Sequence, residues 1–150
     1  MRAGVLVLVV AILAVQALLW GLVILPRVRR GLAAAAREAT TALGGAATLR
    51  EGTVRSMGLA SGGASRLRGT GHLAVAEHEV VFVLVAPRRT LRIPRDAIAA
   101  VDTTRVHHGR ATGRSLVRVR FTDDAGGEDA IAFDVGRRSL EAWREALAAG

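Results

Sequence analysis

The chain has 150 residues, a formal net charge of +8 and no cysteine. This length accommodates one domain of about 100 residues beside a targeting segment, and the lack of cysteine excludes disulfides, thiol nucleophiles and thiolate metal sites. All 21 Lys or Arg positions hold arginine and only 3% of residues are aromatic, so bases would find few rings to stack on and we expect no nucleic-acid partner.

Residues 3–25 form an apolar run with one polar side chain, Gln16, and no charge. A helix of this length, with a rise of about 1.5 Å per residue, spans the ~30 Å hydrocarbon core of a bilayer. Because proline disfavours helix continuation, we predict that this helix ends at Pro26. The expected interfacial anchor consists of Trp20, Arg27, Arg29 and Arg30.

The alternative for this segment is a cleaved signal peptide, with Arg2 in front and small residues at a cleavage-like spacing near Ala17. The apolar part of a signal peptide is usually about 7–15 residues long, whereas here the chain stays apolar as far as Leu25. We therefore expect a retained membrane anchor in residues 1–30. Because arginine is more frequent after the run than before it, the positive-inside rule predicts a cytoplasmic C-terminal part.

Residues 31–47 are rich in alanine and are predicted to form a short helical spacer beside the membrane. Gly44 and Gly45 should stop this helix and form a flexible joint. From residue 48 the apolar residues follow a strand-like rather than a helical period. We therefore expect the folded domain to occupy residues 48–150.

Seven short strands are predicted in this domain, since alternating or continuous apolar runs are separated by turn residues. The continuous run at 80–86 is typical of a buried strand. Loops are expected at 58–69 and at 107–114. The predicted strands, the fifth preceded by a turn, occupy residues 51–57, 69–76, 80–86, 90–94, 95–106, 115–121 and 130–135.

A C-terminal helix is predicted over residues 139–150. Leu140, Trp143 and Leu147 follow the spacing of one helix face, and Ser139 is a candidate N-cap. A small curled sheet leaves an open mouth, which an amphipathic helix can close. We expect Trp143 to be the core plug of this closure.

Seven strands capped by a helix with a core-facing Trp resemble the pleckstrin-homology-like (PH-like) fold, and residues 69–102 are similar to the central portion of bacterial PH-like and GRAM-like domains. The resemblance covers roughly Leu49 to Ala149. It implies a mainly β fold with α, a seven-stranded barrel or sandwich capped by a helix, and a role as a binding module. The matching positions are Gly71, Leu73, Phe82, Ile93, Pro94, Ile98 and Val101.

Where that family binds phosphoinositides, the resemblance implies a basic cluster in the first hairpin loop and the strand after it. The corresponding residues are Arg55, Arg66 and Arg68.

A second basic group surrounds one turn and strand, and it is the candidate surface for a membrane or a partner. If it faces an anionic bilayer, each arginine contributes on the order of 1 kcal/mol of attraction. The alternative is an ordinary solvated face, balanced by acids such as Glu77, Glu79, Asp96 and Asp102. The group consists of Arg88, Arg89, Arg92 and Arg95, and a further outward row of Arg118 and Arg120.

Catalytic and metal motifs are not indicated. The stretch 109–115 has Arg where a phosphate-binding loop needs Lys, and too few residues between its glycines. His107 and His108 are expected to point apart in a surface loop. The carboxylate pairs at 123–124 and 128–129 are expected to be solvated turn residues. We therefore predict no enzyme, no cofactor, no metal and no small-molecule substrate.

The sequence thus predicts a single-pass protein of the cell membrane whose cytoplasmic PH-like domain docks a protein partner and, in part, anionic lipid. The alternative is a structural subunit assembled through its transmembrane helix, since Ala11, Ala14 and Ala17 recur along one stripe and allow close helix approach. Binding of lipid by arginine should weaken with salt, whereas helix pairing should not.

Overall fold

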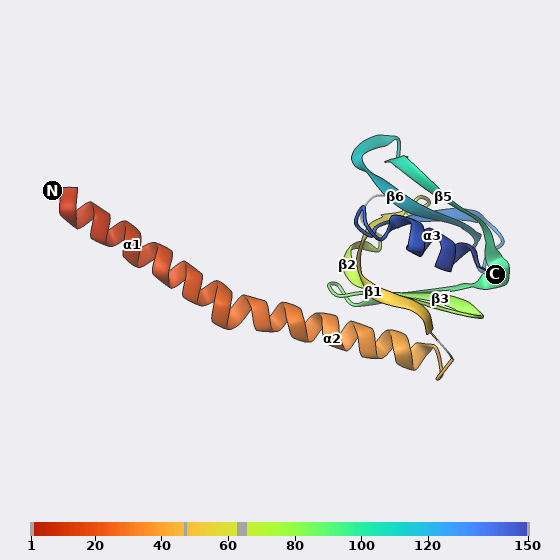
Figure 1. Cartoon of the computed structure of the whole chain (residues 1–150), viewed down its shortest axis with the longest axis horizontal. Coiled ribbons are helices and arrows are strands. Elements are labelled where there is room, and N and C mark those ends of the chain that lie inside the picture. Colours follow the sequence, from red (N-terminus) through yellow and green to blue (C-terminus); the bar gives the residue numbers. More distant parts are fainter. Residues whose placement is uncertain (1, 47, 63–65, 150) are drawn as a thin grey trace.

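The computed structural model describes residues 2–46, 48–62 and 66–149. It begins with one long helix that projects from a β domain (Figure 1). The helix consists of α1 (Arg2–Leu19), a π-helical turn η1 (Trp20–Ile24) and α2 (Leu25–Ala42). One stretch of this helix is long and apolar enough to cross a membrane.

Pro26 does not end the helix, so that prediction is wrong. The π-helical turn precedes the proline, and the Leu25 N–H donates to the Trp20 carbonyl across the wider turn. Pro26 then falls in the first turn of α2. A proline is tolerated there because a first-turn N–H needs no partner within its own helix.

The β domain is a seven-stranded antiparallel sheet that curls into a half-barrel around the C-terminal helix α3 (Leu140–Ala148) (Figure 1). The prediction of a mainly β domain with a closing helix and a preceding apolar helix is therefore confirmed. The strand order is β4-β3-β2-β1-β7-β6-β5. Their bounds are β1 (Thr48–Leu59), β2 (Arg68–Ala76), β3 (Glu79–Leu84), β4 (Arg89–Pro94), β5 (Ile98–His107), β6 (Arg110–Thr122) and β7 (Glu128–Asp134), with a short 3₁₀ turn η2 (Arg95–Ala97) between β4 and β5.

The main core lies between the concave face of the sheet and α3. Trp143 is 4% exposed and packs there with Leu147, while Leu140 is partly buried against the same cluster. The guanidinium of Arg50 lies over the Trp143 ring, 4.9 Å from its centroid. Ser139 is the N-cap residue of α3, as predicted, although its side chain makes no capping hydrogen bond.

The other face of β2 and β3 is covered by α2. Ala35, Ala39 and Leu43 of the helix pack against outward-facing residues of the two strands, among them Val81 and Val83. Val80, Phe82 and Leu84 alternate with these and enter the main core. After Glu79, strand β3 is apolar, and both of its faces are buried. Residues 31–42 therefore do more than space the domain from the membrane, since part of α2 belongs to the domain's packing.

The predicted loop at 107–114 is a two-residue turn between extended strands, which corrects the sequence prediction. Positive φ angles of 52° at His108 and 70° at Gly109 suit the tight turn of a hairpin. Strand β6 therefore begins at Arg110, five residues earlier than the predicted strand at 115–121. The resulting β5–β6 hairpin stands out from the domain (Figure 1).

Candidate functional site: two basic surfaces

The basic group around the β3–β4 turn holds α2 against the sheet. Arg88 pairs with Glu38 of α2 at 3.1 Å, and Arg92 pairs with Glu79 at 2.7 Å while donating to the Ala42 carbonyl at the end of α2. The hydrogen bond and charge of Glu79 raise the pKa of Arg92. These two guanidinium groups are therefore neutralised in part by contacts that orient the helix.

Arg95 does not belong to this surface, although the sequence placed it there. Its guanidinium is half-buried and donates to the carbonyls of Ala76, Ala146 and Leu147. Burial lowers the pKa of Arg95. The side chain thus fastens the C-terminal end of α3, where a cation complements the unpaired carbonyls.

Arg89 is exposed at the start of β4. Arg88 and Arg92 have carboxylate partners, whereas the described residues provide none for Arg89. The outward row on β6 is also partly neutralised, because Arg118 makes two hydrogen bonds to Asp102 of β5, at 2.8 and 2.9 Å. This contact raises the pKa of Arg118, and Arg120 lies 3.8 Å from the same carboxylate.

A different set of arginines meets around the β5–β6 hairpin. Three neighbouring cavities of about 440, 360 and 240 Å³ share lining residues, and so form one furrow. We call this furrow the basic groove. Its arginines are Arg55, Arg68, Arg105, Arg110, Arg114 and Arg137.

The basic groove contains one carboxylate among its lining residues, that of Asp134. Asp134 pairs with Arg114 at 3.0 Å. Within the described part of the chain, no carboxylate lies within 4.0 Å of the other five guanidinium groups. The groove therefore has a large excess of positive charge.

Sequence reasoning found only part of this set. Arg55 and Arg68 were predicted from the resemblance, and both line the groove, whereas Arg66 is exposed next to residues 63–65, which lie outside the described residues. The members on β6 and before α3 were missed because they are far apart in the sequence. The signal that could have found them is the His108-Gly109 pair, which favours a hairpin.

The two adjacent histidines lie at the hairpin tip and are in contact, with ring centroids 4.3 Å apart. This corrects the expectation that they point apart in a surface loop. His107 is 7% exposed, and its Nε2 lies 2.9 Å from the Gly58 carbonyl of β1. A neutral ring with the proton on Nε2 donates this bond. Burial, above all, lowers the pKa of His107.

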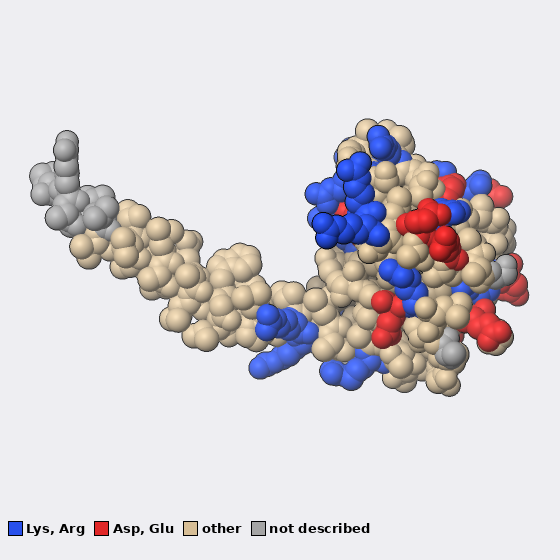
Figure 2. Space-filling model, in the orientation of Figure 1, with Lys and Arg blue, Asp and Glu red and all other residues tan. Residues whose placement is uncertain are grey.

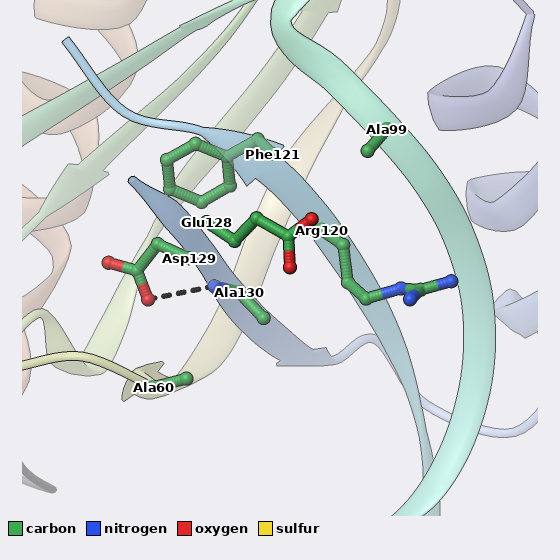
Figure 3. Close-up of a pocket in the computed structure, with 7 residues that line it drawn as sticks. All are labelled: Ala60, Ala99, Arg120, Phe121, Glu128, Asp129 and Ala130. Atoms are coloured by element: carbon green, nitrogen blue, oxygen red, sulfur yellow. Dashed lines mark hydrogen bonds between the residues drawn. The ribbon is translucent and has the colours of Figure 1, made fainter. Parts of the chain in front are cut away.

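The carboxylates of the β6–β7 turn have structural contacts. Asp123 accepts bonds from the N–H groups of Ala125 and Gly127 within the turn. Asp129 is buried, unlike the solvated residue predicted, because it accepts bonds from the backbone and hydroxyl of Ser61 in the β1–β2 loop. It lines a cavity of about 190 Å³ with Glu128, and the two carboxylates point to different sides of it (Figure 3). Among the described residues no three His, Asp or Glu side chains form a metal-binding group.

The predicted interfacial anchor lies where the helix bends. Trp20, at the start of the π-helical turn, is 61% exposed. Arg27, Arg29 and Arg30 are exposed in the first turns of α2. Their position at the end of the apolar stretch agrees with a place near lipid headgroups.

Comparison with known proteins gives information on the fold alone. No protein-family model and no curated protein matches the chain. A solved structure described as "The 8S snRNP Assembly Intermediate" is similar at 8% identity and a TM-score of 0.53, over 67% of this chain and 78% of that one. A second, "Crystal structure of the C-terminal domain of an unknown protein from Leishmania infantum", has 15% identity and a TM-score of 0.48, over 74% and 93% of the two chains. The second score is too low to support an argument.

Proposed function

We propose that this protein is a membrane-anchored binding module of the PH-like type, which docks a protein partner at the inner membrane surface with help from anionic lipid. The PH-like assignment is supported by seven antiparallel strands, the closing helix α3 and the buried Trp143. The membrane assignment is supported by the apolar helix.

The observation that carries this proposal is the packing of α2, which continues the membrane helix, against β2 and β3. Ala35 and Ala39 are fully buried in that contact, and an added Cβ at Gly31 would lie 2.8 Å from Val85. Gly31 is six residues beyond Leu25, about 9 Å along a helix. The domain is thereby held at a fixed orientation close to the bilayer, as a docking module requires.

The cytoplasmic orientation is supported by the charge distribution. Arg27, Arg29, Arg30 and Arg37 follow the apolar stretch, against Arg2 before it, and short flanks rich in arginine stay on the cytoplasmic side. Reporter fusions after Gly150 test this orientation. We expect activity from a reporter that folds in the cytoplasm; activity from a phosphatase that requires the periplasm, or release of a shortened soluble product, would contradict the proposal.

Partner docking is tested by cross-linking in intact membranes followed by purification of the full chain. We expect a protein to be captured by the wild type and lost when α2 is detached from the sheet by Ala39→Asp. The matched control is Ala33→Asp, at an exposed position of the same helix. Capture that persists in both variants and at high salt would instead favour a subunit assembled through its transmembrane helix.

A further inference from the structure

The basic groove is bounded by parts of the chain that are distant in sequence. Arg55 comes from β1, Arg68 from the start of β2, Arg105 from β5 and Arg110 from β6, and Arg137 precedes α3. The three cavities of the groove are open to solvent, and the smallest of them shares lining residues with each of the other two. Guanidinium groups that converge from several directions are well suited to a phosphate group, which can accept bidentate hydrogen bonds on several sides.

Most of the positive charge of the groove is not balanced by carboxylates, in contrast to that of the basic group around the β3–β4 turn. Arg88 and Arg92 have carboxylate partners, whereas in the groove only Arg114 has one among the described residues. Like charges held close together repel one another, so an anion that binds between them relieves this repulsion. The composition of the groove therefore favours an anionic ligand over a neutral or a cationic one.

The position of the groove indicates where that anion comes from. Figure 2 shows arginine side chains gathered over the β5–β6 hairpin, at the edge of the domain from which the N-terminal helix departs. At η1 the helix bends, and α1 tilts toward the side on which this hairpin stands (Figure 1). A bilayer crossed by α1 therefore lies on the hairpin side of the domain.

The hairpin also carries an apolar group suited to a membrane interface. Val106, next to the tip, is 49% exposed. An interface with charged headgroups above acyl chains suits both kinds of side chain.

We propose that the β5–β6 hairpin reaches back to the bilayer and that the basic groove binds the phosphate-bearing headgroup of an anionic membrane lipid. The inference rests on the proposed function in one respect, since α1 must span the membrane. The sequence predicted that lipid would bind at the arginines around the β3–β4 turn, whereas this inference assigns lipid binding to the basic groove. The reason for the change is that the arginines of the β3–β4 turn mainly orient α2.

The test uses the full chain in lipid nanodiscs with a fluorophore on the hairpin. Because the chain has no cysteine, Ala111→Cys provides a single attachment point, at an exposed residue that lines the groove. The emission wavelength is compared between discs of phosphatidylcholine alone and discs that also contain phosphatidylglycerol. We expect a blue shift in the anionic discs that disappears at high salt.

Paired substitutions locate the site. Arg105→Gln with Arg110→Gln should abolish the blue shift, while Arg37→Gln with Arg89→Gln removes the same charge elsewhere and should leave it intact. If the first pair fails to fold, Arg68→Gln with Arg137→Gln removes charge from the opposite wall. A shift lost in the Arg37 and Arg89 variant but kept in the groove variants would overturn the inference in favour of the β3–β4 turn.

Two further outcomes would also overturn it. A wild-type emission that does not respond to phosphatidylglycerol shows that the groove has no lipid ligand. An equal shift caused by soluble glycerol phosphate in phosphatidylcholine discs assigns the groove to a free anion. Retention of the protein in membranes is measured separately, so that a protein released from the membrane counts against the proposed function, whereas a retained protein without the shift counts against the groove alone.

Discussion

Replacing Ala39 by aspartate should detach α2 from the sheet. Ala39 is fully buried, and its neighbours in the contact include Leu43 and Val83. A carboxylate there would be buried without a partner, which costs several kcal/mol, and the larger side chain adds about 1–3 kcal/mol of overpacking. Burial of Leu43 contributes only about 1.5–3 kcal/mol to docking. The exposed pairs of Arg88 and Arg92 add at most about 1 kcal/mol each.

Burial of Val81 and Val83 in the same cluster also helps to hold α2 in place. The penalty is therefore comparable to the free energy of docking, and the population of the detached state should rise. A disulfide between two introduced cysteines measures this population. A Cβ on Gly31 would lie 2.8 Å from Val85 Cγ1, so Gly31→Cys and Val85→Cys place two side chains in direct contact, as a disulfide requires. Mild oxidation followed by labelling of the remaining free thiols gives the rate of bond formation.

We expect rapid disulfide formation in the otherwise wild-type chain and in the Ala33→Asp control. The rate should fall strongly with Ala39→Asp. Equal rates with and without Ala39→Asp would show that α2 stays docked despite the buried charge, and absence of the bond in the wild-type background would show that the helix does not lie on β2 and β3. Either result refutes the argument that packing of α2 sets the domain's orientation.

Three other substitutions test the packing of the domain. Trp143→Ala should lower the free energy of unfolding by about 3–5 kcal/mol, since it empties the space between α3 and the sheet; a loss below about 1 kcal/mol in denaturant titrations would contradict this. Arg95→Gln should cost about 1.5–3 kcal/mol, because charged hydrogen bonds to the end of α3 are lost, and hydrogen exchange should rise in α3 first. Burial lowers the pKa of His107, so the unfolded chain binds the proton more readily and stability should fall as the pH drops below about 6.5. His107→Gln can still donate to Gly58 but does not titrate, and the pH dependence of its thermal midpoint should be flatter than that of the wild type.

The strands could be predicted from sequence because each has a local signature. The alternation of apolar and charged residues along β6 and the turn residues at 123–127 are visible without knowing any partner strand. The long apolar run of β3 was also found as a buried strand. What covers its second face could not be found, since Ala35 and Ala39 are as typical of an exposed helix as of a packed one, and only the contact with Val81 and Val83 distinguishes the two.

Side-chain partners were harder to predict than strands. Arg92 and Arg95 are three residues apart, yet one pairs with Glu79 on the surface and the other binds the carbonyls at the end of α3. Arg92 lies in β4, whereas Arg95 is the first residue of the η2 turn that follows this strand. Pro26 was misjudged for a related reason, because the π-helical turn that accommodates it has no signature in the surrounding residues.

The two basic surfaces differ in how far carboxylates neutralise their arginines. This difference connects the packing of the domain to its proposed role. The charges of Arg88 and Arg92 are partly neutralised by ion pairs with Glu38 and Glu79. These contacts help to fix the angle between α2 and the sheet. Among the described residues, the basic groove has no such partner apart from Asp134, so its charge is available to a ligand. In the proposed membrane-anchored arrangement, the fixed angle of α2 would turn the groove toward the same side of the bilayer in every molecule. A contact too weak to bind a free domain is then sufficient, since the tether supplies the effective concentration that affinity does not.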